Sequence, residues 1–346
     1  MIRTKLSRIL VGEGSLRFIE REIERLEPFK VGVVTNTTVG RLWLSKLEEY
    51  VRPNEVFYIG DGERFKNIST VVKLWRKLID ANFTRKSLLI GFGGGVVGDI
   101  AGFVASTFMR GMMFAQIPTT LLAQVDASIG GKTGINFYGK NLIGTFYQPL
   151  FIVIDIDFLT TLPMKEFLNG MAEVIKYGVI YDKSFFSYIR GNVERIKERD
   201  KSCLLELVKR SVEIKVEIVE EDERESGLRR ILNFGHTIGH GIEKVSNYRI
   251  KHGFAVSIGM ILECKLAEAL TGFSETEAVK HLLESFGLST HTHFKLTDIV
   301  KAMIYDKKAW YGKLAFALPK EIGRVEIVEV DANDVLSIIG GKNEWN

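Results

Sequence analysis

The sequence of 346 residues has little of several features that define specialised protein classes. Its two cysteines, Cys203 and Cys264, are too few and too far apart for a disulfide framework or a zinc ribbon. It has no run of about 18 apolar residues, and its first residues, MIRTKLSRILVGEGS, have no apolar core. We therefore expect a cytoplasmic protein with neither a membrane span nor a secretion signal.

An excess of charge of one sign is also missing. The formal net charge is +4, which gives no reason to expect a nucleic-acid partner but suits a small anionic substrate. Hydrophobic residues make up 46% of the chain and charged residues 26%, as in a globular protein with a large core. The length suits two domains better than one.

The first part of the chain alternates short apolar segments with segments of helical periodicity. Buried strands are predicted at 30–36, 55–62, 87–95 and 150–159. Strands that alternate with helices indicate a parallel α/β sheet. We therefore predict an α/β domain over residues 1–160.

The remaining part, residues 161–346, is dominated by long helical patterns. The segment 212–218, VEIKVEI, alternates with period two, but its helical flanks favour a helix. The segment from Lys313 to Val330 is typical of a β-hairpin. We predict a mostly α-helical second domain and expect the active site in a cleft between the two domains.

The stretch LIGFGGGVVGDIAG, residues 89–102, fits the dinucleotide fingerprint G-x-G-x-x-G at Gly93, Gly95 and Gly98. The spacing alone is a weak signal, since it also occurs in tight turns, and residues 100–125 contain no acid to bind a ribose. Consecutive glycines nevertheless allow close approach of a ligand to the backbone, and Asp61 or Glu63 after an earlier strand could bind the ribose. The first domain is therefore predicted to be a Rossmann-like nucleotide-binding domain.

The stretch DASIGGKTG is close to a phosphate-binding P-loop, but Asp126 stands where the leading glycine belongs. A carboxylate there repels phosphate, which argues against an ATPase. Lys132 could still contact a single phosphate.

Three of the six histidines, His236, His240 and His252, lie close together in the sequence. His236 and His240 are four residues apart, which places them on one helical face, as metal sites favour. Their alternative role is that of ordinary hydrogen-bonded polar residues. Glu173 on an otherwise apolar helix is a plausible further ligand, with Lys176 one turn later. Lysines, an arginine and an asparagine beside a metal would suit a phosphorylated, polyhydroxylated substrate.

Six segments together resemble the 3-dehydroquinate synthase family in order and spacing. They are GGGVVGDIAGFVASTFMRG, IPTTLLAQVDASIGGKTGIN, GKNLIGTFYQP, MAEVIKYG, LNFGHTIGHGIE and KHGFAVSIGM, and the likeness runs from about Lys30 to beyond Lys308. The resemblance implies a homodimer with a nicotinamide-binding first domain and a metal-binding helical second domain. The implied cofactors are NAD and a divalent metal, Zn²⁺ or Co²⁺.

The same resemblance assigns site residues by motif. It makes Glu173, His236 and His252 the metal ligands. His240, which its spacing from His236 suggests as a second ligand, would instead contact the substrate phosphate. The implied NAD-binding residues are Glu63, Lys66, Gly94, Gly95, Asp99, Thr119, Thr120, Lys140, Thr161 and Leu162. The implied substrate-binding and catalytic residues are Arg110 (across the dimer interface), Asp126, Lys132, Asn141, Lys176, Lys215, Arg229, Asn233, His240 and Lys307 or its neighbour Lys308.

The implied reaction converts 3-deoxy-D-arabino-heptulosonate 7-phosphate to 3-dehydroquinate and phosphate. NAD⁺ takes a hydride from the substrate, phosphate is eliminated, the hydride is returned, and an intramolecular aldol step closes the ring. Because NAD is regenerated in each turnover, such an enzyme is a lyase. Three alternatives stay open: another sugar-phosphate cyclase such as an inosose or valiolone synthase, a metal-dependent polyol dehydrogenase, and a non-catalytic nucleotide-binding module.

Overall fold

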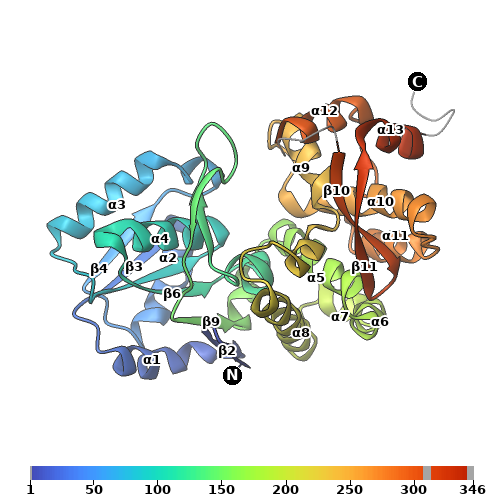
Figure 1. Ribbon diagram of the computed structural model, residues 1–346. Coiled ribbons are helices and arrows are strands. Elements are labelled where there is room, and N and C mark those ends of the chain that lie inside the picture. The colour runs from blue at the N-terminus through green and yellow to red at the C-terminus, as the bar shows by residue number, and fades with distance from the viewer. Residues whose placement is uncertain (1, 307–312, 341–346) are drawn as a thin grey trace. The chain divides into compact units, whose positions relative to one another are not determined.

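The computed structural model describes residues 2–306 and 313–340. The chain forms two compact units. The first, here called the sheet unit, comprises Met1–Phe167 and Leu204–Arg224. The second, the helical unit, comprises Leu168–Cys203 and Glu225–Asn346. Figure 1 labels the elements of both units.

The sheet unit contains a seven-stranded sheet whose strands pair in parallel, except that the edge strand β1 pairs antiparallel with β2. In spatial order the strands are β1 (Ile2–Arg3), β2 (Arg8–Gly12), β9 (Phe151–Asp155), β6 (Met113–Pro118), β5 (Leu88–Gly93), β3 (Val31–Asn36) and β4 (Glu55–Ile59). From β4 to β9 this is the doubly wound order 2-1-3-4-5, whose direction of winding reverses between β3 and β5. Ligands of such sheets bind at the carboxyl ends of the strands at this switch point.

Helices cover both faces of the sheet (Figure 1). On one face α3 (Ile68–Asp80) and α4 (Gly95–Thr107) pack on strand residues such as Leu89. On the other face α1 (Ile19–Leu26) and α2 (Thr37–Glu48) pack on residues such as Ile90. Because β5 is buried on both faces, it is the continuous apolar run typical of a central parallel strand.

The two units divide the chain differently from the single expected boundary at residue 160. The sheet unit continues to Phe167 and regains residues 204–224, which include most of α8 (Lys201–Glu221). Val216 and Val219 of α8 line a small cavity together with Ile129 and Ile152 of the sheet unit. An apolar stripe on a helix packs wherever it can be buried, and the order of residues along the chain does not reveal the partner.

The helical unit confirms the predicted change of class. Its helices are α5 (Met164–Ile180, which starts in the sheet unit), α6 (Lys183–Gly191), α7 (Val193–Lys197), α9 (His236–Val245), α10 (His252–Leu270), α11 (Thr276–Ser285), α12 (Leu296–Asp306) and α13 (Ala332–Gly340). The predicted hairpin is present as β10 (Lys313–Glu321) and β11 (Arg324–Asp331). Residues 212–218 are helical, as their flanks indicated. Among the described helices, none is long and apolar enough to cross a membrane.

Candidate functional site

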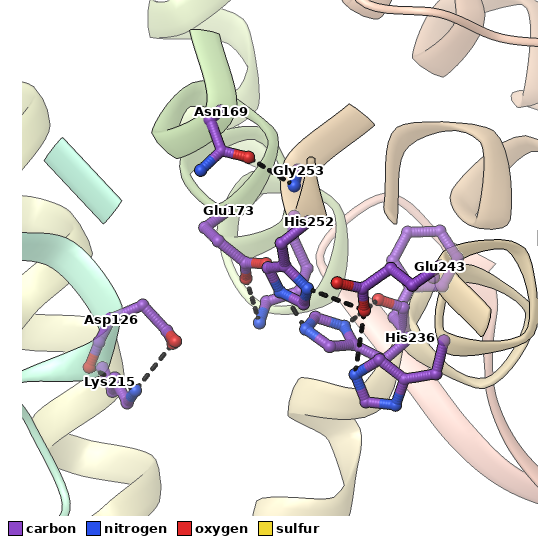
Figure 2. A network of polar contacts seen from close by, with 12 residues as sticks. Asp126, Asn169, Glu173, Lys215, His236, Glu243, His252 and Gly253 are labelled. Atoms are coloured by element: carbon purple, nitrogen blue, oxygen red, sulfur yellow. Dashed lines mark hydrogen bonds and ion pairs between the residues drawn. The ribbon is translucent and has the colours of Figure 1, made fainter. Parts of the chain in front are cut away.

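Three helices of the helical unit bring one acid and two histidines together (Figure 2). Glu173 lies in the middle of α5, while His236 and His252 are the first residues of α9 and α10. The Nε2 atoms of both histidines lie 3.3 Å from Glu173 Oε1. The ligand atoms of the three residues all lie within 4.8 Å of one another. This set, here called the triad, includes all three residues that the motifs assign to the metal.

The other ring nitrogen of each histidine in the triad faces a hydrogen-bond acceptor. His236 Nδ1 lies 3.1 Å from the carbonyl oxygen of Phe234 and His252 Nδ1 lies 3.3 Å from Glu243 Oε2. When Nδ1 carries the proton of a neutral imidazole, its Nε2 presents a lone pair to the triad. Two lone pairs and a carboxylate oxygen directed at one point repel one another unless a cation lies among them. Two imidazoles and a carboxylate are a donor set of catalytic zinc, so the residues fit a divalent metal.

The electrostatic surroundings put two of the triad's residues, Glu173 and His236, in the protonation states that bind metal. Burial by itself raises the pKa of Glu173, but Lys176 and the histidines together hold this pKa well below its usual value. Lys176 Nζ lies 2.5 Å from Glu173 Oε2. Burial lowers the pKa of His236 and outweighs the opposing effect of Glu173. At neutral pH, Glu173 is therefore ionised and His236 neutral, as metal ligands must be.

His240 lies beside the triad without belonging to it. Its ring centre is 5.5 Å from that of His236 and 5.9 Å from that of His252, and 43% of its side chain is exposed. His240, Glu243 and His252 form a second possible ligand set. This set would use the Nδ1 atom of His252 that already faces Glu243, and it would leave Glu173 and His236 without a cation. The geometry thus favours the triad as the metal site over the pair of His236 and His240.

Two further predicted substrate residues belong to the 3₁₀ segment Leu228–Asn233, which leads into α9. Arg229 is buried and Asn233 Nδ2 donates to Glu225 Oε1 at 2.8 Å. The buried Lys176 completes the set of predicted substrate residues placed in the helical unit. The predicted Lys307 lies outside the described residues.

The glycine-rich stretch of the sheet unit lies at the switch point. Strand β5 ends at Gly93, and Gly94 is the N-cap of α4. A Cβ on Gly98 would lie 2.5 Å from Gln116 Oε1, so Gly98 permits close packing of α4 on β6. Thr119, just after β6, donates its N–H to the carbonyl of Gly93 at 2.9 Å. A glycine turn, a helix N-terminus and close helix–strand packing are the features that hold a pyrophosphate in dinucleotide sites.

Several predicted cofactor residues gather around Lys66. Lys66 Nζ lies 2.5 Å from Asp99 Oδ2 and 2.5 Å from Asn141 Oδ1. Burial raises the pKa of Asp99, and the cation of Lys66 opposes this effect. Nearby in the chain, Glu63 Oε1 accepts a hydrogen bond from Asn136 Nδ2 at 2.8 Å. The structure thus joins Asn141, which the motifs assign to the substrate, with residues that they assign to the cofactor.

Asp126 and Lys215, both predicted to bind substrate, form a second polar pair in the sheet unit (Figure 2). Lys215 Nζ lies 2.6 Å from both the carboxylate Oδ1 and the carbonyl oxygen of Asp126. Asp126 belongs to the π-helical turn Ala123–Ala127, and such turns are frequent at functional sites.

The remaining predicted residues of the sheet unit lie at strand ends and turns. Lys132 is exposed at the start of β7 (Lys132–Ile135), which pairs with β8 (Ile143–Phe146), and Lys140 lies in the loop between them. Arg110 is exposed in a turn with a φ of 65°. Thr161 accepts a hydrogen bond from Trp43 Nε1 at 2.9 Å, and Leu162 follows it.

Sequence reasoning missed three buried polar residues next to the triad, Asn169, Glu243 and Glu263. Asn169 lies one turn before Glu173, and Glu243 lies one turn after His240. Polar residues on otherwise apolar helix faces were the available signal.

The fold places the chain among the sugar-phosphate cyclases. The 2-epi-5-epi-valiolone synthase of Streptomyces hygroscopicus was solved with NAD⁺ and Zn²⁺ bound. It is 26% identical in sequence, with a TM-score of 0.85, and the match covers 97% of this chain and 96% of the synthase. A 2-deoxy-scyllo-inosose synthase, solved with carbaglucose-6-phosphate, NAD⁺ and Co²⁺, shares 27% identity at a TM-score of 0.83, covering 96% and 95%.

Sequence comparison selects one family within this class. Residues 56–169 match the family model for the 3-dehydroquinate synthase N-terminal region and residues 170–309 the one for the C-terminal region. The 3-dehydroquinate synthase of Pyrococcus abyssi is 52% identical over 322 residues, which are 92% of this chain and 95% of the relative. The chain belongs to the 3-dehydroquinate synthase family.

Proposed function

We propose that this chain converts 3-deoxy-D-arabino-heptulosonate 7-phosphate to 3-dehydroquinate and phosphate, as a phosphate-eliminating carbon–oxygen lyase. The observation that carries the proposal is the convergence of Glu173, His236 and His252 in a chain that matches this family from residue 56 to 309. The valiolone and inosose synthases share the fold at about half the identity of the P. abyssi relative, which supports the dehydroquinate reaction over theirs.

The triad would hold Zn²⁺ or Co²⁺, and the glycine loop of the sheet unit would hold NAD. When bound, the metal supplies a Lewis acid and NAD⁺ supplies a reversible hydride acceptor. The proposed NAD-binding residues are Glu63, Lys66, Gly94, Gly95, Asp99, Thr119, Thr120, Lys140, Thr161 and Leu162.

Cationic side chains of this chain would bind the anionic groups of the substrate. Arg110, Lys132 and His240 would stabilise the negative charge that grows on the departing phosphate. Lys176, Lys215 and Arg229 would bind the carboxylate and hydroxyl groups and keep the reacting atoms aligned through successive steps. Asp126 holds Lys215 by direct contact, and Asn141 and Asn233 would complete the hydrogen bonds to the hydroxyl groups. We propose that Lys307 also binds an anionic group of the substrate.

We further propose a homodimer in a reducing, cytoplasmic environment. Two buried free cysteines agree with such an environment. An anionic sugar phosphate is the proposed small-molecule partner, and the near-neutral charge offers no support for nucleic acid. Light scattering coupled to size-exclusion chromatography tests the dimer.

A product assay tests the activity. The protein is incubated with the heptulosonate phosphate, zinc and NAD⁺ at a small fraction of the substrate concentration. We expect phosphate and dehydroquinate in equal amounts, far above the amount of NAD⁺, and no accumulation of NADH. NADH that accumulates without phosphate would show a dehydrogenase instead. Turnover of other sugar phosphates only would show a different cyclase.

A further inference from the structure

Glu263 is a buried acid that the proposed chemistry does not use. It lies on α10, three turns after His252, and its exposed fraction is 0%. Its Oε2 accepts a hydrogen bond from the backbone N–H of Gly235 at 2.6 Å, and its Oε1 accepts one from Ile238 at 3.1 Å. The first donor, Gly235, is the N-cap residue of α9, and the second, Ile238, lies in the first turn of this helix, which begins at His236.

The start of α9 needs a cap from elsewhere in the chain. The first N–H groups of a helix have no partner within the helix. The N-cap residue, Gly235, has no side chain to supply one and has a φ of 77°. Glu263 therefore caps α9 from the neighbouring helix, where the helix dipole also favours a carboxylate.

Close packing at the same place brings the two helices into direct contact. A Cβ on Gly259 of α10 would lie 2.0 Å from the carbonyl oxygen of Gly235. A Cβ on Gly235 would lie 2.5 Å from Met260 Cγ. The backbone of α10 thus packs closely against Gly235, the residue that precedes His236, and the Glu263 hydrogen bonds join the same two segments.

The third helix of the triad is fixed to α10 in a similar way. Asn169 lies on α5 one turn before Glu173, and its Oδ1 accepts a hydrogen bond at 2.7 Å from the N–H of Gly253, the residue after His252 (Figure 2). Helix α10 therefore holds α5 through Asn169 and α9 through Glu263. Each contact lies within one turn of a metal ligand.

We propose that Glu263 is a positioning residue of the metal centre. By capping α9 from α10, it holds His236 at the spacing from His252 and Glu173 that a single divalent cation requires, before the cation binds. The inference rests on the proposed metal site. Outer partners that orient metal ligands typically change metal affinity about 10- to 100-fold when they are removed.

The test compares Glu263→Gln with a matched control, Cys264→Ala. Cys264 is the next residue on α10 and is equally buried, but it is not one of the residues that cap α9. Metal-free protein is prepared for the wild type and both variants. Zn²⁺ affinity is measured by competition with a chromophoric chelator, the Co²⁺ absorption spectrum reports ligand geometry, and thermal unfolding of the metal-free protein reports stability.

We expect Glu263→Gln to raise the Kd for Zn²⁺ about 10- to 100-fold and to alter the Co²⁺ spectrum. Cys264→Ala should lower the melting temperature of the metal-free protein but leave the Kd and the spectrum unchanged. An unchanged Kd and spectrum in Glu263→Gln would overturn the inference. An equal loss of Zn²⁺ affinity in Cys264→Ala would also overturn it, because the loss would then follow from lower protein stability and not from the cap on α9.

Two additions keep the outcome interpretable. If Glu263→Gln does not fold, Glu263→Asp keeps the charge but is one methylene too short to reach both N–H groups, and the same affinity loss is expected. The variant His236→Ala establishes that the wild-type cation binds at the triad. A wild type that binds no Zn²⁺ would contradict the proposed function itself, whereas a tight wild-type site that Glu263→Gln leaves unchanged would contradict only the positioning role.

Discussion

The glycine turn of the sheet unit and the triad of the helical unit are built from different parts of the chain. The glycine turn is made mainly of backbone, with Gly93, Gly94 and the first N–H groups of α4 at the end of one strand. The triad is made of side chains from three helices, and Glu173 at its centre is fully buried. A backbone site depends on local conformation, whereas a side-chain cluster depends on how helices pack. The two sites should therefore fail independently and for different reasons.

The largest effect is expected when the triad is disrupted. Glu173→Gln or His236→Ala should leave the purified protein with almost no bound metal and should lower kcat about a thousandfold or more, since a catalytic metal stabilises the transition state by several kcal/mol. Metal content by atomic emission and NAD⁺ affinity by calorimetry separate the two sites. NAD⁺ affinity in the metal-free state should stay within about twofold of the wild type. A variant that keeps one metal per chain would refute the ligand assignment.

The converse change should weaken the cofactor site alone. A side chain at Gly94 would obstruct the approach of a pyrophosphate to the backbone, and its Cβ would already lie 3.0 Å from Thr120 Cγ2. Gly94→Val should therefore raise the Kd for NAD⁺ about 100-fold and leave the metal content unchanged. Gly12→Ala is the control, because a Cβ there meets Ser15 at an ordinary 3.6 Å. Equal losses in both variants would point to damage of the sheet instead of the cofactor site.

A smaller, pH-dependent effect is expected at Lys66. Lys66→Met removes the cation that opposes the effect of burial on Asp99, so the pKa of Asp99 should rise further. An acid whose pKa is higher in the folded than in the unfolded protein stabilises the fold below its unfolded pKa, and that contribution is lost as the pH rises through the folded pKa. The stability of the variant should therefore decline over a wider range above pH 4 or so than that of the wild type.

Carbon-13 NMR of labelled aspartate measures this pKa directly, and urea unfolding at several pH values measures the stability. NAD⁺ affinity at neutral pH should fall about tenfold, as expected for a lost charged hydrogen bond. A pKa of Asp99 that stays the same or falls would show that the ion pair with Lys66 does not exist in solution.

The smallest effect concerns the rigidity of the helices that carry the triad. Burial raises the pKa of the Cys264 thiol on α10 well above its usual value, so the thiol should react with a maleimide only when α10 opens. Metal that joins α10 to α5 and α9 should slow this reaction several-fold. Cys203 near the start of α8 is also buried but lies on no ligand helix, so its reaction should not depend on metal. Equal slowing of both thiols would indicate a general effect of metal on the unit.

Much of the sheet could be predicted because its signals are local. The strands at Val31–Asn36 and Leu88–Gly93 are apolar runs bounded by turn residues, and both lie within the predicted segments. The segment Met113–Pro118, by contrast, forms a central strand that the alternation of patterns did not single out, since it follows α4 after a short turn. The assignment of α8 to the sheet unit was also beyond prediction, because Val216 and Val219 indicate a buried face without naming its partner.

The sequence by itself determined the fold class, the glycine turn and, through its ordered motifs, the identity of the candidate metal ligands. Helical spacing alone predicted His236 and His240 as metal ligands, because spacing shows only which residues share one face of a single helix. Only the tertiary structure decided that the first residues of two helices meet Glu173 of a third, and that Asn169, Glu243 and Glu263 hold them there. The physical reason is that turns follow from local backbone preference, whereas the position of a buried side chain follows from the packing of helices distant in sequence.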